Sequence, residues 1–216
     1  MSRKHLLSAS ALALIVAAFV APQVSGQVFV GTPVPAQYTG QGQPSTAKGE
    51  WPTNAGDIRG TRYSPLDQIN AQNFNQLQVA WRLKTDMFGP YPEWKLEGTP
   101  IMVKGVLYTT AGTRRSVIAL DAKTGELIWS HSLREGKRAA IAPRQLSGRG
   151  VSYWTDGNGD DRIIYITTGY RMVELNAKTG QMIDSFGDHG IVDLKVGVYK
   201  GNHEQVDLET GEIGVH

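Results

Sequence analysis

Oxygen-bearing side chains at alternate positions are the most direct candidate for metal chemistry in this sequence. Asp156, Asn158 and Asp160 are spaced like the first three ligands of a calcium-binding loop. That loop also needs a glycine at its sixth position and a glutamate at its twelfth, where this chain has Asp161 and Thr167. The pattern fails, so the segment predicts the polar tip of a β-hairpin and no metal ligand is assigned.

Other familiar site patterns are missing from the sequence. There is no cysteine, which excludes disulfides, cysteine–zinc sites and cysteine nucleophiles. The five histidines have no metal-binding spacing, and no glycine run has the G-x-G-x-x-G form. Without Arg3 and Lys4 near the N-terminus, 20 basic residues face 20 acidic ones, which disfavours a nucleic-acid partner. No catalytic residue is predicted from these patterns.

Residues 1–26 have the layout of a secretory signal peptide. A basic start precedes the mostly apolar stretch 6–21, and small residues follow where a signal peptidase would cut, before Gln27. The alternative is an uncleaved anchor, but the stretch is shorter than the ~20 residues that span a bilayer. We expect export to the periplasm and no membrane span after cleavage. Residues 27–49, rich in Gly, Pro and Gln, are expected to form an extended leader to a domain over 50–216.

Short apolar runs separated by turn residues make up this domain. They are rich in β-branched and aromatic residues, as strands are. The expected strands cover residues 77–83, 99–110, 116–120, 126–133, 151–155, 162–168, 172–175 and 181–184. One helical segment is expected at 64–78, where Ser64 can act as N-cap and Pro65 stands at the first helical position. The domain is therefore predicted to be all-β.

A turn signature occurs twice along these strands. ALDAKTGELIW at 119–129 and ELNAKTGQMID at 174–184 are 55 residues apart. This period is close to the ~40–50 residues of a four-stranded propeller blade. A β-sandwich is the alternative, but it does not predict a repeated A-x-D-x-x-T-G-x-x-x-W pattern. The repeat favours a β-propeller of four-stranded antiparallel blades, with the first two to three blades of an incomplete ring in this chain.

Each residue of the signature has a structural role. Asp121 can accept backbone N–H groups in the turn, Gly125 can adopt a positive φ, and Trp129 can pack one blade against the next. The second copy has Asp184 in place of the tryptophan. We therefore expect the turn twice and the docking tryptophan once.

The signature resembles the tryptophan-docking motif of quinoprotein dehydrogenases, eight-bladed propellers that bind pyrroloquinoline quinone (PQQ). The likeness extends from Glu50 to about Val198, and its last two segments are most similar to the glucose-dehydrogenase-like branch. The resemblance implies an enzyme that oxidises a sugar or alcohol and passes electrons to ubiquinone or cytochrome c. The similar segments, in family order, are 51–81, LEGTPIMVKGVLYTT (96–110), RGVSYW (149–154) and FGDHGIVDLKVGV (186–198).

The resemblance also implies the cofactor-binding residues. Glu97 matches the family glutamate near a PQQ carboxylate, and Arg149 matches the arginine that pairs with a PQQ carboxylate and with that glutamate. A guanidinium suits this role because its fork binds a carboxylate at two points. Thr167 or Thr168 matches a threonine that hydrogen-bonds the cofactor, and the two remain alternatives. The competing interpretation of Glu97 and Arg149 is an ordinary ion pair between blades.

Two departures from the family bear on activity. Many alcohol-oxidising relatives have two adjacent cysteines before the Arg-Gly motif, whereas residues 141–150 contain none, as in the glucose-dehydrogenase-like branch. The catalytic aspartate and most Ca²⁺ ligands of the family lie in later blades. We therefore expect an N-terminal piece of the enzyme that is inactive alone, with Ca²⁺ ligands mainly beyond this chain. The alternative function is a non-enzymatic propeller scaffold of the cell envelope, as in outer-membrane assembly factors.

Overall fold

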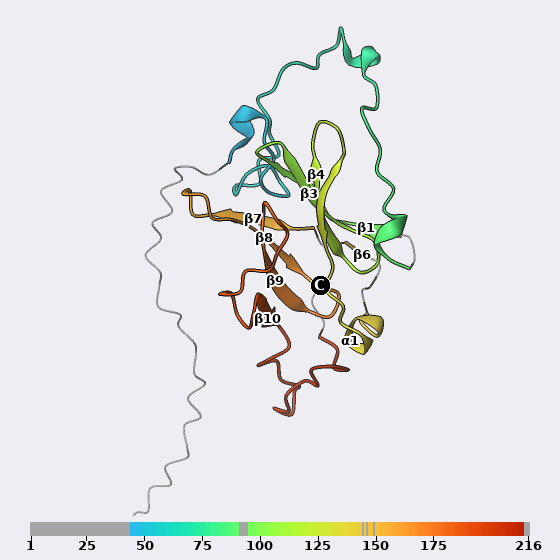
Figure 1. Ribbon diagram of the computed structural model, residues 1–216, viewed down its shortest axis with the longest axis vertical. Coiled ribbons are helices and arrows are strands. Elements are labelled where there is room, and N and C mark those ends of the chain that lie inside the picture. Colours follow the sequence, from blue (N-terminus) through green and yellow to red (C-terminus); the bar gives the residue numbers. More distant parts are fainter. Residues whose placement is uncertain (1–43, 91–94, 144, 146, 149, 214–216) are drawn as a thin grey trace, which may run out of the picture. The chain divides into compact units, whose positions relative to one another are not determined.

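Two four-stranded antiparallel sheets follow one another along the chain (Figure 1). The expected signal peptide and most of the expected leader lie outside the residues that the structure describes. Within the described part of the chain, no helix has the length and apolar character needed to cross a membrane. The computed structural model describes residues 44–90, 95–143, 145, 147–148 and 150–213.

Both sheets are up-and-down meanders, and we name them blade 1 and blade 2. The predicted all-β architecture of four-stranded antiparallel sheets is confirmed, and the two sheets form no closed ring within the described residues. Blade 1 consists of β2 (Ile101–Val103), β3 (Val106–Ala111), β4 (Ser116–Asp121) and β5 (Leu127–His131). Blade 2 consists of β7 (Ser152–Thr155), β8 (Asp161–Ile166), β9 (Arg171–Asn176) and β10 (Ile191–Asp193).

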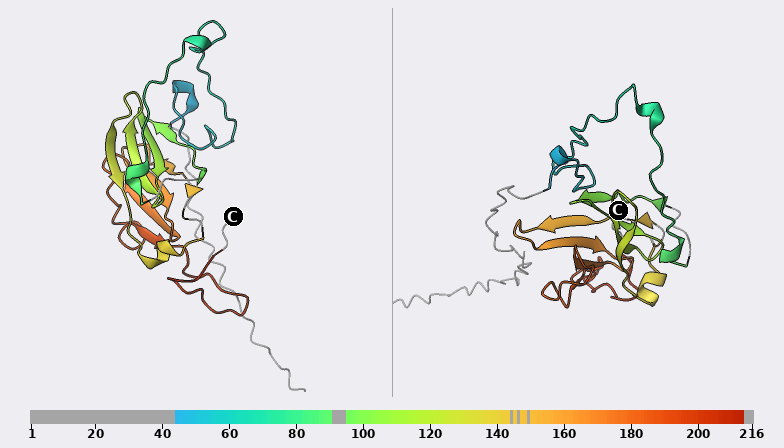
Figure 2. Two further views of the ribbon diagram at one scale, coloured as in Figure 1. Left: turned by 90° about the vertical axis from the view of Figure 1, so that its right-hand side faces the viewer. Right: turned by 45° about the horizontal axis from the view of Figure 1, so that its top comes forward.

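One hydrophobic core joins the two blades. Buried and partly buried residues alternate most regularly in β8, as expected for a strand with one face toward a core. Strands of the two blades lie next to each other in all views of Figures 1 and 2. Burial of apolar side chains from both blades in this core is the main contribution that holds the blades together. The shared buried cluster consists of Ile101, Val103, Tyr108, Val117, Ala119, Ile163, Tyr165, Val173, Leu175 and Ala177.

A tryptophan of blade 1 contacts the turn of blade 2, as the repeat predicts. Trp129 Nε1 donates a hydrogen bond to the Ala177 carbonyl oxygen, 3.0 Å away. Gly180 in the same turn has a φ of +71°, and a Cβ there would lie 2.6 Å from Trp129 Cε3. Glycine is required at this position both for its backbone conformation and for the close approach of the indole. The predicted docking role of Trp129 is confirmed.

A second tryptophan contacts the turn of blade 1. Trp81 Nε1 donates a hydrogen bond to the Ala122 carbonyl oxygen at 3.2 Å, and a Cβ on Gly125 would lie 2.5 Å from the indole. Trp81 precedes blade 1 in the chain, so the turns of blade 1 and blade 2 each receive a tryptophan from the preceding segment. The docking contact therefore repeats along with the turn.

The strand predicted over residues 77–83 is not formed. Leu77 and Val79 are 53% and 64% exposed, and no strand among the described residues pairs with this segment. Alternating apolar residues become a strand only where a partner supplies backbone hydrogen bonds. The segment instead holds Trp81 against blade 1.

The helix predicted over 64–78 is reduced to one 3-10 turn, η2 (Phe74–Gln76). Asn73 Oδ1 accepts a hydrogen bond from the Asn70 backbone N–H, and Asn70 Oδ1 accepts one from the Gln72 N–H. Such local bonds compete with helical hydrogen bonds. The apolar residues of this segment are also exposed, so no packed face stabilises a helix. The helix prediction is wrong.

Two strand predictions in the blades change in detail. The run predicted at 99–110 is a hairpin of two strands, β2 and β3, with a turn at Lys104 and Gly105. Both turn residues have positive φ, 53° and 77°, which matches the twist of a two-residue hairpin. The strand predicted at 181–184 is a single bridge at Met182, and β10 is the outer strand of blade 2 instead. Each blade thus has four strands of its own.

An ion pair links the blades at the end that carries the β2–β3 turn. Lys104 Nζ and the Tyr153 hydroxyl each donate a 2.7 Å hydrogen bond to a carboxylate oxygen of Asp161, which is 5% exposed. Burial raises the pKa of Asp161, but the hydrogen bonds it accepts, first that from Lys104, outweigh burial and lower the pKa to about 2. The carboxylate is therefore charged at neutral pH.

Short elements complete the described part of the fold. β1 and β6 pair in parallel, and α1 lies between β5 and β6 in the chain. Of these elements, α1 and β6 lie in the connection from blade 1 to blade 2, and β1 precedes blade 1. Their bounds are β1 (Lys95–Leu96), β6 (Ser147–Gly148), α1 (Lys137–Ala140), η1 (Thr46–Lys48) and η3 (Asp86–Phe88).

Candidate functional site

One end of the two blades carries the loops and strand starts that could form a site. Because β2 pairs antiparallel with β3, β2 begins at the end where the β3–β4 connection, residues 112–115, turns. In blade 2, β7 likewise begins at the end of the β8–β9 connection, residues 167–170. We name this the loop end. It contains the segments that lead into β2 and β7, where Glu97 and Arg149 stand in the sequence.

The segments before β2 and β7 run side by side. β1 and β6 pair in a parallel register that joins Leu96 to Gly148, and Glu97 and Arg149 are the next residues along the two segments. Arg149 itself lies outside the described residues. The Glu97 side chain is 46% exposed, and its Oε1 lies 3.4 Å from Lys95 Nζ. Glu97 is therefore accessible to a ligand at the loop end.

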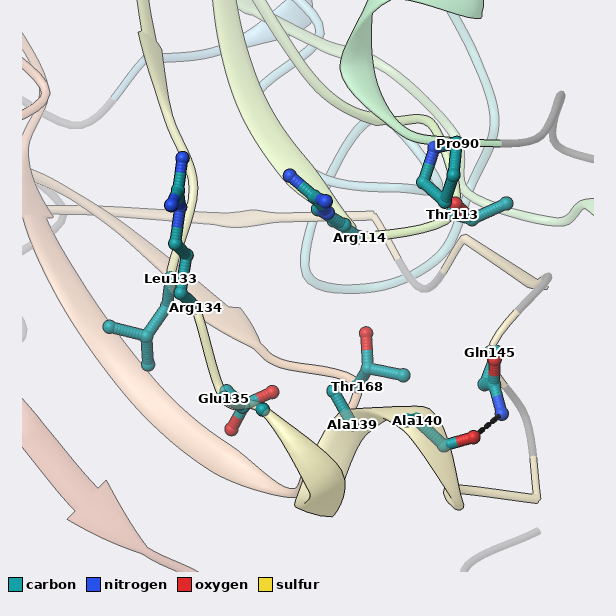
Figure 3. Close-up of a pocket in the computed structure, with 11 residues that line it drawn as sticks. Pro90, Thr113, Arg114, Leu133, Arg134, Glu135, Ala139, Ala140, Gln145 and Thr168 are labelled. Atoms are coloured by element: carbon teal, nitrogen blue, oxygen red, sulfur yellow. Dashed lines mark hydrogen bonds between the residues drawn. The ribbon is translucent and has the colours of Figure 1, made fainter.

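The two candidate threonines differ in what their hydroxyl groups contact. Thr167 is 2% exposed, and its Oγ1 donates to Glu135 Oε1 at 2.8 Å and accepts from the Arg171 backbone N–H at 2.9 Å. Thr168 is 4% exposed and lines a cleft, into which its hydroxyl points (Figure 3). The Thr167 hydroxyl thus serves the turn, whereas the Thr168 hydroxyl is directed toward open space.

A buried carboxylate holds the β8–β9 connection. Glu135 follows β5 of blade 1, and its side chain is 2% exposed. It accepts hydrogen bonds from Thr167 Oγ1, the Gly169 N–H and Arg171 Nη1, each 2.8 Å long. Gly169 cannot carry a side chain, because a Cβ would lie 2.7 Å from Glu135 Oε1. The segment that leaves blade 1 therefore fixes the orientation of Thr168 in blade 2.

A buried guanidinium from α1 adds to this network. Arg138, 4% exposed, donates from Nε to the Gly169 carbonyl and from both terminal nitrogens to Asp193, each at 2.6 Å. These bonds lower the pKa of Asp193, although burial acts in the opposite direction. Sequence reasoning missed Glu135 and Arg138, since their segment has no periodicity and its partners lie far along the chain.

A cleft of about 510 Å³ opens beside this network (Figure 3). It is lined by the β3–β4 connection, by residues between 133 and 145, and by Thr168. Arg114 and Arg134 in its lining are exposed, so this end of the blades offers cationic and hydroxyl donors. That donor set fits an anionic, carboxylated group such as PQQ.

The described residues give less support for a metal-binding site than for an anion-binding one. The segment from Asp156 to Asp160 forms the β7–β8 hairpin tip, where Asp156 Oδ1 accepts hydrogen bonds from the N–H groups of Asn158 and Asp160. The hairpin prediction is confirmed. No group of three or more His, Asp or Glu side chains that could hold a metal ion occurs in the part of the chain that the structure describes.

The turn signature occurs a third time, which sequence reasoning also missed. Asp207 Oδ1 accepts hydrogen bonds from the Glu209 and Thr210 backbone N–H groups and from Thr210 Oγ1. Asp121 makes the equivalent three bonds in blade 1. The pattern D-x-x-T-G at 207–211 was the available signal.

Comparisons with known proteins agree on one family. Residues 51–213 match the model of the glucose/ethanol/alcohol dehydrogenase β-propeller domain, PQQ. The dehydrogenase subunit of the alcohol dehydrogenase (quinone) of Gluconobacter oxydans (strain 621H) is 36% identical over 183 residues, 84% of this chain and 22% of that protein. The solved quinohemoprotein alcohol dehydrogenase ADHIIG of Pseudomonas putida HK5 has a TM-score of 0.57 and 34% identity, over 69% of this chain and 20% of that one. A europium-containing methanol dehydrogenase has a TM-score of 0.52 and 29% identity, over 62% of this chain and 22% of that one.

The chain spans about a fifth of the length of the curated relatives it matches. Its two four-stranded blades correspond to part of a propeller, so the predicted fold is confirmed. The resemblance drawn from the turn signature and the flanking segments is confirmed as well. The chain belongs to the PQQ family of glucose, ethanol and alcohol dehydrogenase β-propellers.

Proposed function

We propose that this chain supplies two neighbouring blades of a PQQ-dependent dehydrogenase that oxidises the CH–OH group of a sugar or alcohol. The match over residues 51–213 and relatives named as alcohol and glycerol dehydrogenases support this function. When bound, PQQ would accept the hydride removed from the substrate. The described residues would contribute to binding and orienting the cofactor, and the substrate-side groups would come from other blades.

Glu97, Arg149 and Thr168 are proposed to bind the cofactor. The observation that carries this assignment is the parallel β1–β6 register, which places the segments before Glu97 and Arg149 side by side. A guanidinium there would pair with a carboxylate of PQQ, and Glu97 would orient that guanidinium. Thr168 is favoured over Thr167 because the Thr167 hydroxyl is already bonded to Glu135.

Export and electron transfer complete the proposal. Residues 1–26 have the signal-peptide layout, which supports a periplasmic location. Ubiquinone or cytochrome c is the proposed electron acceptor. Ca²⁺ is the proposed metal ion, held mainly by residues of later blades, and the europium-containing relative supports a metal requirement in the family. The chain alone is proposed to be inactive, as an N-terminal piece of the enzyme.

A non-enzymatic envelope scaffold is the alternative function. It accounts for the blades and their docking tryptophans equally well. It does not account for a glutamate and an arginine at the ends of two paired segments, nor for relatives that are dehydrogenases. The enzymatic proposal is therefore preferred.

Dye reduction with added PQQ and Ca²⁺ tests the function. The chain joined to the later blades of the propeller should reduce the dye with a sugar or alcohol, whereas the 216-residue chain alone should not. Thr168→Val in the active form should raise the PQQ concentration needed for half-maximal activity about fivefold, because one hydrogen bond to a charged group is lost. Activity without PQQ, or no activity with every sugar and alcohol tried, would reject the proposal.

A further inference from the structure

Both backbone polar groups of Gly169, the residue after Thr168, are held by buried charged side chains. Glu135 Oε2 accepts the Gly169 N–H at 2.8 Å, and Arg138 Nε donates to the Gly169 carbonyl oxygen at 2.6 Å. The first bond fixes the peptide plane between Thr168 and Gly169, and the second fixes the next peptide plane along the chain. The backbone that follows Thr168 therefore has one orientation, in which the Thr168 hydroxyl points into the cleft (Figure 3).

The two charged side chains are themselves anchored at further points. Glu135 Oε1 accepts hydrogen bonds from Thr167 Oγ1 and Arg171 Nη1, each at 2.8 Å. The terminal nitrogens of Arg138 donate to both carboxylate oxygens of Asp193, the last residue of β10, at 2.6 Å. A rotation of either side chain would break bonds to several segments at once. The connection from blade 1 to blade 2 and the end of β10 therefore hold the β8–β9 connection together.

Stability alone does not account for this network. The side chains of Glu135 and Arg138 are 2% and 4% exposed. Moving charges from water into such a place is unfavourable, and well-packed apolar side chains are often at least as stable there. Directional hydrogen bonds add a single specified geometry. That geometry leaves no room for variation at Gly169, where a Cβ would lie 2.7 Å from Glu135 Oε1 and 2.9 Å from Arg138 Cγ.

We propose that Glu135 and Arg138 are positioning residues for the cofactor. They act through the backbone of Gly169, which sets the direction in which the Thr168 hydroxyl donates to PQQ. They make no contact with the cofactor themselves. The inference rests on the proposed function and extends it to the connection between the blades, which also leads to Arg149. One segment would thus position two of the cofactor contacts.

The dissociation constant for PQQ tests the inference, measured by equilibrium titration of the active form proposed above, in which the chain is joined to the later blades of a propeller. Glu135→Gln keeps the shape of the side chain but replaces one acceptor oxygen with an NH₂ group, so a bond to the turn is lost. The dissociation constant should rise about fivefold, as for Thr168→Val. Arg138→Lys keeps the charge but not the planar fork, and should have a similar effect.

Asp161→Asn is the matched control. Asp161 is also a buried carboxylate that links the two blades through hydrogen bonds, but it does so at the end of the β2–β3 turn. Its replacement should lower the melting temperature and change the dissociation constant for PQQ less than twofold. An equal loss of PQQ affinity in Asp161→Asn and Glu135→Gln would show a general effect of stability and would overturn the inference.

A double-variant cycle separates positioning from a structural role. In a Thr168→Val background there is no hydroxyl to position, so Glu135→Gln should change the dissociation constant less than twofold. A further fivefold rise in that background would contradict the inference, as would an unchanged affinity in Glu135→Gln alone. Where melting curves show that Glu135→Gln does not fold, Arg138→Lys is measured in the same cycle.

Two further variants distinguish this inference from the proposed function. If Arg149→Ala and Thr168→Val weaken PQQ binding but Glu135→Gln does not, only the positioning role fails. If none of the three variants changes the affinity for PQQ, the proposed cofactor site fails and the positioning role fails with it.

Discussion

Blade 1 and blade 2 share the same turn but differ in how they dock. In blade 1, the Trp81 indole packs on the turn, and Trp129 of the outer strand packs on the turn of blade 2. In blade 2, Asn176 Oδ1 accepts the same two backbone N–H groups as its counterpart, but Asp184 stands where a docking tryptophan would be. The turn is therefore a local device of one blade, whereas the tryptophan is a contact between blades. The two can be gained or lost separately.

The outer strands show the consequence of this difference. β5 in blade 1 has five residues and follows the turn directly, whereas β10 in blade 2 has three and begins at Ile191, after an irregular segment. The third turn, at Asp207, packs against Val206 rather than an indole. Docking by tryptophan thus holds blade 1 to blade 2, and other contacts stabilise the region after β10.

Removal of the docking indole should have the largest effect. Trp129→Ala should lower the free energy of unfolding by about 3–5 kcal/mol, because it leaves a cavity on the blade 2 turn and removes the hydrogen bond that the indole donates to the Ala177 carbonyl. Trp154→Ala is the matched control, since Trp154 is 42% exposed on β7 and, among the described residues, its ring stacks with Arg162. It should cost about 1 kcal/mol. Urea denaturation measures both, and equal losses would contradict the docking role.

Glycine substitutions can separate backbone strain from contact with the indole. Gly180→Ala places a Cβ 2.6 Å from Trp129, whereas Gly105→Ala, at a similar φ of +77°, meets nothing within 4 Å. Gly105→Ala should cost about 1 kcal/mol and Gly180→Ala about 3 kcal/mol. In a Trp129→Ala background, the cost of Gly180→Ala should fall to that of Gly105→Ala. An unchanged cost in that background would show that the indole does not select glycine.

The Lys104–Asp161 ion pair should contribute less and should depend on pH. In the folded state the pKa of Asp161 is about 2, below the ordinary 3.8. The charged carboxylate therefore contributes about 2 kcal/mol to the free energy of unfolding above pH 4, and this contribution is lost as the pH falls toward 2. Asp161→Asn should therefore be less stable than the unmodified chain at pH 6 and nearly equal to it at pH 2. Chemical denaturation across this range checks the prediction, and a pH-independent difference would contradict it.

Local features were predictable from the sequence, and features that depend on a partner were not. The turn at Asp121 and Gly125 could be predicted because its hydrogen bonds and positive φ involve neighbouring residues. The strand expected at 77–83 failed because its apolar alternation does not reveal whether a partner strand exists. Glu135 and Arg138 gave no local signal, since their partners lie 31 to 55 residues away.

The proposed cofactor residues belong neither to the local features nor to those that depend on a partner strand. Glu97 and Arg149 came from resemblance to a family, and no periodicity in the sequence points to them. The segments before them run side by side because β1 pairs with β6. Each of these strands has only two residues, which is too short to be predicted from a sequence pattern. Thr168 could be separated from Thr167 only through the hydrogen bonds of Glu135, a residue that the sequence did not single out.

The PQQ dissociation constant of the Arg149→Ala variant is the most direct test of the cofactor site. It should be measured in the active form proposed above, in which the chain is joined to the later blades of a propeller, together with the melting temperature. We predict a dissociation constant at least tenfold higher, or about 1.4 kcal/mol, with a melting temperature that changes by less than about 2 °C. An unchanged affinity for PQQ, or a loss of stability that accounts for all of the lost affinity, would contradict the cofactor assignment and support a structural ion pair between blades.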